Sequence, residues 1–158
     1  MFKSKTSWRD KLEKPQAPKL VTVPPKMAAR FGTGKMLIPT PMLVDEVMRS
    51  VGKGKLITAG QIRQKLARDC GADVTCPLTT GIFMRIAAEA AEEDRANGRK
   101  RITPYWRVVK DDGSLNPKFP GGEAQQARHL RDEGIQTLRC GKKVLVKGFE
   151  KTSRVGSE

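Results

Sequence analysis

The stretch ITPYWRVVKDDGSL occupies residues 102–115 and decides the fold that we expect. The β-branched and aromatic residues between Ile102 and Lys110 are typical of a strand. Asp111-Asp112-Gly113 then predicts a hairpin turn, because glycine tolerates the positive φ that such turns require. The return begins at 114–116. The stretch therefore predicts a β-hairpin.

Two helices joined by a tight turn precede this hairpin. Thr58 is a favourable N-cap for a helix over 59–69, and a second helix is predicted from about Cys76 to Ala96. Its apolar residues recur at i, i+4 and are expected to be buried: Leu78, Ile82, Ile86 and Ala90. A helix-turn-helix followed by a hairpin is a winged helix in outline, so the predicted fold is mainly α with a small β wing.

Further helices are predicted on both sides of this unit. One begins near Thr40-Pro41, a cap followed by proline at the first helical position, and another covers about Glu123–Glu133. These limits predict three parts of the chain. Residues 1–40 form an extended, proline-containing basic arm, 41–134 form the winged-helix domain, and 135–158 form a basic extension with a loose C-terminal tail.

The charge favours nucleic acid as the partner. The chain of 158 residues has a formal net charge of +14 and a pI near 10.1, which is typical of proteins that bind polyanions. Residues 1–40 hold nine Lys and Arg against two Asp and Glu. Either a solvated tail or an arm that touches the partner fits this composition. Trp8 is unusual in a tail and is a candidate to dock on the domain.

Several function classes are disfavoured by what the sequence lacks. No run approaches ~18 apolar residues, so we expect no membrane-spanning helix, and no apolar stretch follows the basic start, so we expect no secretory signal. Three Cys without CxxC spacing and a single His predict no metal site. The phosphate-loop motif GxxxxGK[ST] is absent, and we expect no cofactor.

Scattered thiols favour a reduced, cytoplasmic location, in association with the nucleoid or the ribosome.

The segment around Tyr105 resembles the active-site segment of the alkylguanine-DNA alkyltransferases. The family's PCHRVV, short turn and GS-L correspond to residues 104–115, and its GYxGG-like element corresponds to 119–122. A helix ending in Glu-Gly follows, here Glu133-Gly134. The resemblance covers about residues 41–134. It implies the winged helix-turn-helix DNA-binding domain of that family.

The residues that carry the family's chemistry are different here. Tyr105 stands at the position of the acceptor Cys and Trp106 at that of the His. A phenol with a pKa of ~10 is a poor nucleophile at neutral pH. Ala59 and Leu78 stand at the positions of the Tyr and Arg that act on a flipped base. Alkyltransferase-like proteins also lack the Cys and keep DNA binding. The resemblance therefore implies a non-enzymatic DNA-binding protein that recognises or signals damaged DNA.

The same outline predicts which residues contact nucleic acid. Thr and Arg side chains can bind phosphates or base edges, and Lys side chains of a wing can bind the backbone. The candidates are Thr79, Thr80, Arg85, Arg63, Lys110 and Lys118. An ordinary helix whose outer face is exposed to solvent, without contact to nucleic acid, would also account for these residues. Four acidic residues further along the same helix predict that its distal part points away from nucleic acid: Glu89, Glu92, Glu93 and Asp94.

A second set of residues corresponds to the remnant of the family's pocket: Tyr105, Trp106, Arg107, Phe119 and Glu133. The aromatic rings either line an open pocket and stack on a base, or fill the vacated site and stabilise the core. In the second case Glu133 accepts a hydrogen bond from Tyr105 or Trp106.

Two other functions fit the sequence. The high pI and the basic ends suit an RNA-binding or ribosome-associated structural protein. Alternatively, Cys76 lies at a helix N-terminus, where the pKa of a thiol falls, and could serve an alkyltransferase as its nucleophile. A small, buried structural residue next to Pro77 is the simpler interpretation of Cys76.

Overall fold

The computed structural model describes residues 7–149, which form six α-helices, one turn of 3₁₀ helix and three small sheets. The helices are α1 (Trp8–Glu13), α2 (Pro25–Phe31), α3 (Pro41–Arg49), α4 (Ala59–Cys70), α5 (Pro77–Ala96), η1 (Tyr105–Arg107) and α6 (Gly122–Asp132). The strands are β1 (Lys19–Thr22), β2 (Lys35–Ile38), β3 (Ile57–Thr58), β4 (Val74–Thr75), β5 (Val108–Val109), β6 (Thr137–Cys140) and β7 (Lys143–Val146). The fold is thus mainly helical with small sheets, as predicted.

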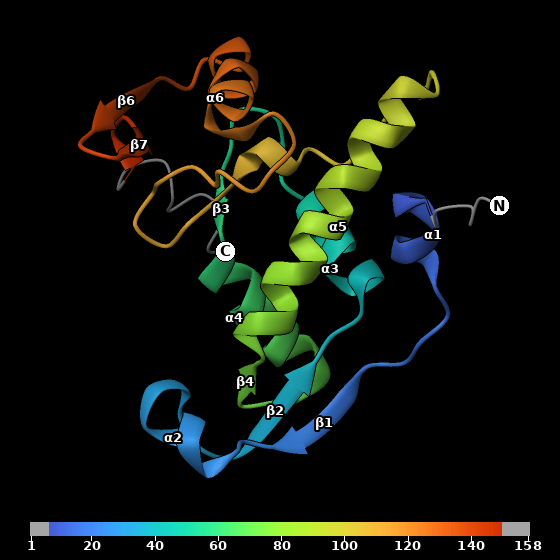
Figure 1. Cartoon of the computed structure of the whole chain (residues 1–158). Coiled ribbons are helices and arrows are strands. Elements are labelled where there is room, and N and C mark those ends of the chain that lie inside the picture. The colour runs from blue at the N-terminus through green and yellow to red at the C-terminus, as the bar shows by residue number, and fades with distance from the viewer. Residues whose placement is uncertain (1–6, 150–158) are drawn as a thin grey trace, which may run out of the picture.

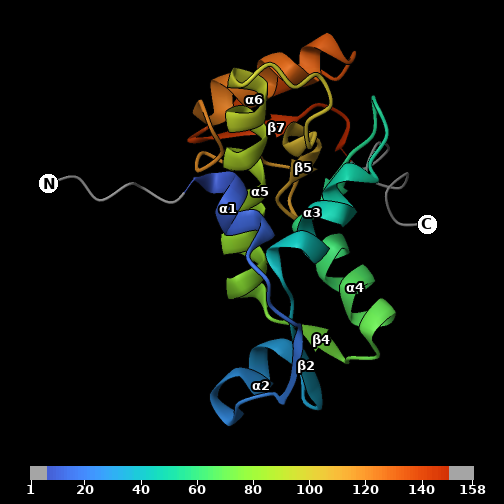
Figure 2. The ribbon, with the colours of Figure 1, turned by 90° about the vertical axis from the view of Figure 1, so that its right-hand side faces the viewer.

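The 20-residue helix α5 forms the central column of the molecule (Figures 1 and 2). Helices α1 and α3 pack along it, while α6 lies near its C-terminal end and the β1–β2–β4 sheet near its start. The main core joins α1, α3, α4 and α5 through apolar residues that include Leu12, Met48, Ile62 and Ala87. A second core lies between α6 and β7, around Leu130.

Local signals fix the limits of the helices. Thr40 accepts a hydrogen bond from Leu43 N (3.2 Å), and Pro41 occupies the first helical position of α3. Thr58 and Gln61 form a reciprocal capping box at the start of α4. Gly71, with φ of 68°, ends α4 in the left-handed conformation that glycine adopts without steric cost. These predicted helices are confirmed within one or two residues.

Each sheet is short and pairs segments that are distant in sequence. Strand β2 pairs antiparallel with β1, from Lys19 opposite Ile38 onwards, and parallel with β4. Strand β3 pairs parallel with β5, which places Ile57 opposite Val108. The remaining pair, β6 and β7, is antiparallel.

The prediction that residues 1–40 are extended is wrong for the described part, 7–40. This segment forms α1, β1, α2 and β2, and Leu12 is buried in the main core. Backbone N–H groups of Trp8 and Arg9 donate to the Glu93 carboxylate at 3.1 and 3.0 Å, which satisfies the free donors at the start of α1. Six residues are too few to form a stable helix on their own, so α1 forms because it packs against α5. Trp8 does dock on the domain, packed against the main core.

The predicted strand over 102–110 is reduced to Val108–Val109, after the 3₁₀ turn at Tyr105–Arg107. Successive side chains of a strand point to opposite faces, yet Trp106 and Arg107 both bind Glu133, which requires a turn. The hairpin is also incomplete. Lys110 N donates to Ser114 O (2.9 Å), but β5 pairs with β3, and Ser114 bridges Leu145 instead of pairing with β5.

The predicted basic extension after residue 134 is folded over 135–149. Strands β6 and β7 form an antiparallel hairpin there, because Ile135 and Val146 are buried against Leu130 in the second core. Most of the predicted loose tail, residues 150–158, lies outside the described residues.

The apolar stripe of α5 is buried only in its later part. Leu78 and Ile82, predicted to be buried, are 70% and 50% exposed, whereas Ala90 is 1% exposed. Helix α1 packs on α5 through Glu93 and Asp94, more than a helical turn beyond these two residues. No helix among residues 7–149 combines the length and apolar character needed to span a bilayer.

Candidate nucleic-acid interface

A cavity of about 610 Å³ opens beside the first half of α5. Helix α1 forms one wall, and the loop after β5 forms another. We call it the α5 cavity; its lining is Trp8, Lys11, Pro77, Leu78, Gly81, Ile82, Arg85, Ile86, Lys110, Asn116, Pro117 and Lys118. It brings together three of the six predicted contact residues, Arg85, Lys110 and Lys118.

The lining of the α5 cavity carries four positive charges and no acidic side chain. Besides the three predicted residues, Lys11 contributes its ammonium group, which lies 4.2 Å from the Trp8 ring centroid. The Arg85 guanidinium lies 5.9 Å from the same ring and 3.8 Å from Glu89, an exposed pairing that contributes little stability. A cationic rim around exposed apolar residues suits a ligand with phosphates and flat bases.

Gly81 leaves the exposed face of α5 open. A Cβ atom built on Gly81 meets no heavy atom within 4 Å. Glycine inside a helix costs about 1 kcal/mol relative to alanine, and no packing within the described protein explains it here. The missing side chain allows the backbone of a partner to approach α5 between Leu78 and Ile82.

The two threonines of the predicted contact set have different surroundings. Thr79 is half-buried, and its hydroxyl lies 3.4 Å from Cys76 O. Thr80 is 1% exposed and donates to Cys76 O at 2.7 Å, within the first turn of α5. The prediction of Thr80 as a groove contact is therefore wrong, because its hydroxyl is used inside the protein.

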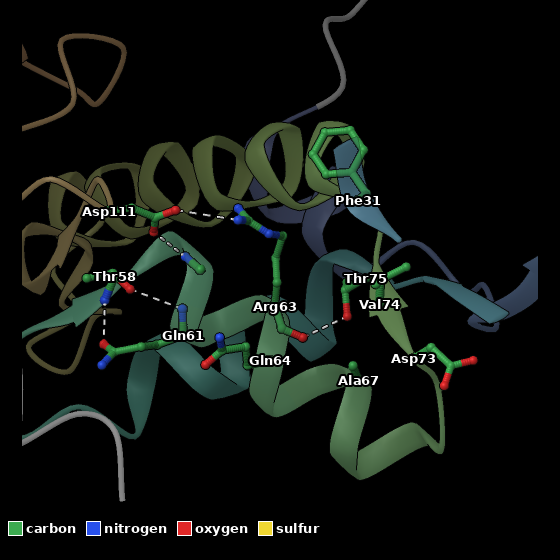
Figure 3. A pocket seen from close by; sticks show the side chains of 11 residues that line it. Phe31, Thr58, Gln61, Arg63, Gln64, Ala67, Asp73, Val74, Thr75 and Asp111 are labelled. Atoms are coloured by element: carbon green, nitrogen blue, oxygen red, sulfur yellow. Dashed lines mark hydrogen bonds and ion pairs between the residues drawn. The ribbon is translucent and has the colours of Figure 1, made fainter. Parts of the chain in front are cut away.

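Arg63 lies apart from the α5 cavity, on α4, where it lines a separate cavity of about 470 Å³ (Figure 3). Its guanidinium lies 3.5 Å from Asp111, which also accepts a hydrogen bond from Gly60 N at 2.7 Å. Asp111 thereby fastens the turn after β5 to the start of α4. The structure does not bring Arg63 together with the other predicted contacts.

The five residues of the predicted pocket remnant form packed networks, and two of them, Trp106 and Arg107, also line a cleft at the surface. Tyr105 is fully buried, edge-on to Trp106 and Phe119 at 5.3 and 5.5 Å. Its phenol donates to Glu92 Oε2 at 2.6 Å. Burial, with this hydrogen bond, raises the pKa of Tyr105 well above its ordinary value. The tyrosine therefore occupies the core of the domain, the second of the two alternatives that the sequence left open.

Glu133 is the centre of the neighbouring network. It accepts hydrogen bonds from Trp106 Nε1 (2.8 Å), Arg107 Nη2 (2.7 Å) and Gly54 N (3.0 Å). Burial alone would raise the pKa of Glu133, but the hydrogen bonds from Arg107, Gly54 and Trp106 outweigh it and lower the pKa. The expected hydrogen bond comes from Trp106 and not from Tyr105. On its other side, Trp106 stacks on His129 with centroids 4.3 Å apart.

The acidic residues late in α5 have partners inside the protein. Glu93 caps α1, and Asp94 pairs with Arg9 at 3.3 Å. Glu92 binds Tyr105 and also Arg95 at 2.6 Å. Burial opposes ionisation of Glu92, but the hydrogen bonds from Tyr105 and Arg95 lower its pKa overall. These carboxylates thus face α1 and η1, which explains why they occur together in a basic protein.

Cys76 is buried at the start of α5, 7% exposed, among Val23, Met36 and their neighbours. A bulky DNA lesion would have to displace this packing to reach the thiol. Among residues 7–149, no three His, Cys, Asp or Glu side chains are grouped closely enough to hold a metal ion.

Comparison with known proteins identifies the fold but no sequence family. No protein-family model matches the sequence, and no curated protein matches it significantly. Among solved structures, S. pombe ATL in complex with DNA aligns with a TM-score of 0.50 at 18% identity, over 72% of this chain and 92% of that chain. In fold, this chain is similar to S. pombe ATL. S. pombe Atl1 in complex with damaged DNA containing O6-carboxymethylguanine aligns over the same shares, with a TM-score of 0.49 and 18% identity. The similarity to S. pombe ATL supports the alkyltransferase-like fold that the sequence implied.

Sequence reasoning missed part of the α5 cavity. The sequence predicted an extended arm where α1 forms, so Lys11 was not a candidate contact residue. The periodicity of α5 also predicted that Leu78 and Ile82 are buried in the core. Gly81 was the available signal, since a glycine inside a helix costs about 1 kcal/mol relative to alanine and therefore indicates a packing or functional reason for its presence.

Proposed function

We propose that this chain is a DNA-binding protein of the alkyltransferase-like type, which holds DNA at the α5 cavity and transfers no alkyl group. The observation that carries the proposal is the lining of that cavity, where Lys11, Arg85, Lys110 and Lys118 surround the exposed start of α5 without an acidic neighbour in the lining. The similarity of fold to DNA-bound S. pombe ATL supports nucleic acid as the partner.

In this proposal α5 is the recognition helix and the loop 110–118 is the wing. Leu78 and Ile82 project from α5 beside Gly81, so the helix offers a slim apolar edge to the groove or to an unstacked base. Lys110 and Lys118 stand at the two ends of the wing loop, where they would bind phosphates.

The part of the proposal that excludes alkyl transfer is based on the surroundings of two side chains, Tyr105 and Cys76. Tyr105, at the position of the family's acceptor, is fully buried, with its pKa raised by burial and by Glu92. A neutral, buried phenol is neither accessible nor nucleophilic at pH 7. Cys76, the other candidate, is buried away from the α5 cavity.

A competition experiment tests the proposal. Labelled duplex DNA is titrated with the protein and competed with unlabelled duplex DNA, duplex DNA containing an O6-alkylguanine, and duplex RNA. We expect DNA to compete better than RNA, the alkylated duplex to compete at least as well as the unmodified one, and the protein mass to stay unchanged after incubation with alkylated DNA. Preferential competition by RNA would instead favour the ribosome-associated alternative, and a mass increase equal to the alkyl group would contradict the non-enzymatic role.

A further inference from the structure

A second basic cleft, of about 370 Å³, lies past the C-terminal end of α5. It is lined by Arg49, Lys100, Arg101, Arg107 and Trp106, with Ile102 and Pro104, and includes no acidic side chain. It shares no lining residue with the α5 cavity. The α5 cavity lies along the first half of α5, whereas Lys100 and Arg101 follow its last residue, Ala96; α5 itself is about 30 Å long, since its 20 residues rise 1.5 Å each.

Two of the four cations are held in place by buried carboxylates. Asp45, 1% exposed, accepts from Arg49 Nε at 2.8 Å and from Thr103 Oγ1 at 2.5 Å. It thereby ties the end of α3 to the segment that follows α5. Arg107 is fixed by Glu133 and by Val51 O (2.6 Å). These contacts fix the walls of the cleft and balance the charges of both arginines.

The other two cations have no such role. Lys100 and Arg101 are exposed, and within the part of the chain that the structure describes neither forms an ion pair or a side-chain hydrogen bond. The preceding Arg99 differs, because it lies 4.0 Å from Asp94. Two uncompensated cations over a cleft with a fixed arginine wall suit a phosphate group, which arginine binds in bidentate fashion.

We propose that this cleft binds a phosphate of the nucleic-acid backbone, outside the stretch that the α5 cavity holds. The proposal rests on the proposed function, because the phosphate belongs to the same DNA. A backbone contact is favoured over a small phosphorylated ligand since the free cations stand at the open rim, where they can reach a long polyanion. About nine base pairs of B-DNA span 30 Å, so only a duplex longer than this can reach both ends of α5.

The test compares the double variant Lys100→Ala/Arg101→Ala with the matched control Lys19→Ala/Lys26→Ala. The control also removes two exposed positive charges, from β1 and α2, and neither residue lines either basic site. Affinity is measured for an 8-base-pair and a 24-base-pair duplex over a salt series. We expect the Lys100/Arg101 variant to bind the long duplex roughly tenfold more weakly than the control in 0.1 M salt. We also expect the slope of its log K against log salt to fall in magnitude by about 0.9, the value for one phosphate, while both variants bind the short duplex alike.

Three outcomes would count against the inference. If the wild-type protein bound neither duplex, the proposed function would fail, and this site with it. If the wild type bound but the variant and the control gave the same affinity and slope on the long duplex, only the second site would be wrong. If the variant lost binding of inorganic phosphate, followed by NMR, without any effect on DNA, the cleft would be a small-anion site and the backbone contact would be refuted.

Discussion

The phenol of Tyr105 donates a 2.6 Å hydrogen bond to the carboxylate of Glu92, four residues before Ala96, the last residue of α5. The pair joins the segment that resembles the alkyltransferase active site to the column of the domain. Tyr105, which the sequence resemblance places at the acceptor position of the alkyltransferases, therefore links η1 to α5 in this structure. Gln125 Nε2 adds a hydrogen bond to the same phenol oxygen at 3.1 Å.

Replacing Tyr105 by Phe should lower the free energy of unfolding by about 1–3 kcal/mol, since Glu92 would lose one of its hydrogen-bond donors while the ring packing is kept. Urea denaturation monitored by Trp fluorescence measures this difference. An unchanged midpoint would show that the hydrogen bond contributes nothing. DNA binding should stay within twofold of wild type, because Tyr105 lies outside the α5 cavity.

Replacing Glu133 by Gln should destabilise the protein by about 3 kcal/mol, because Glu133 and Arg107 are only 8% and 13% exposed and the Arg charge would lose its partner. The same urea experiment measures it, with Glu123→Gln in the first turn of α6 as the control. An effect no larger than that of the control would contradict the network.

Stability should also fall in acid. The pKa values of Glu92 and Glu133 are lowered in the folded protein, since hydrogen bonds outweigh burial, so the unfolded chain binds more protons as the pH falls through the ordinary carboxyl range. Their contribution is present above about pH 5 and is lost towards pH 3. Urea unfolding from pH 7 to 3 should show this loss, and Glu133→Gln should show a smaller one. If the free energy of unfolding depended on pH equally in the wild type and in Glu133→Gln, Glu133 would not be an ionised, stabilising carboxylate in the folded protein.

Replacing Gly81 by Ala should stabilise the protein by up to about 1 kcal/mol, since α5 gains a better helix former and the new methyl group meets nothing within 4 Å. In the same variant DNA binding should weaken, because the methyl group occupies the space left for the partner. Thermal unfolding and a binding titration are measured on one preparation. Unweakened DNA binding would mean that no partner approaches α5 at Gly81.

The local parts of the fold could be predicted from the sequence, and the tertiary parts could not. Thr40, Thr58 and Gly71 act within one turn of the chain, so their helix limits were predictable. Periodicity shows that a helix has an apolar face but not which neighbour covers it. For this reason Leu78 and Ile82 were placed in the core.

Contacts between distant residues explain the remaining differences. Helix α1 depends on the hydrogen bonds that Glu93 accepts from Trp8 and Arg9, which lie 85 and 84 residues before it in the chain. The turn at Tyr105–Arg107 depends on Glu133. For the site, residue type alone identified Arg85, Lys110 and Lys118, but only the packing of α1 brings Lys11 and Trp8 beside them.

The central claim is that DNA is held by the cations of the α5 cavity. Its most direct test is the salt dependence of duplex binding by wild type and by Arg85→Ala/Lys110→Ala/Lys118→Ala. We expect the slope of log K against log salt to be smaller in magnitude for the triple variant than for the wild type, by about 2.7, because three cations are removed. We expect the free energy of unfolding to be unchanged, because none of the three side chains has a buried partner. A slope equal to that of the wild type would contradict the account.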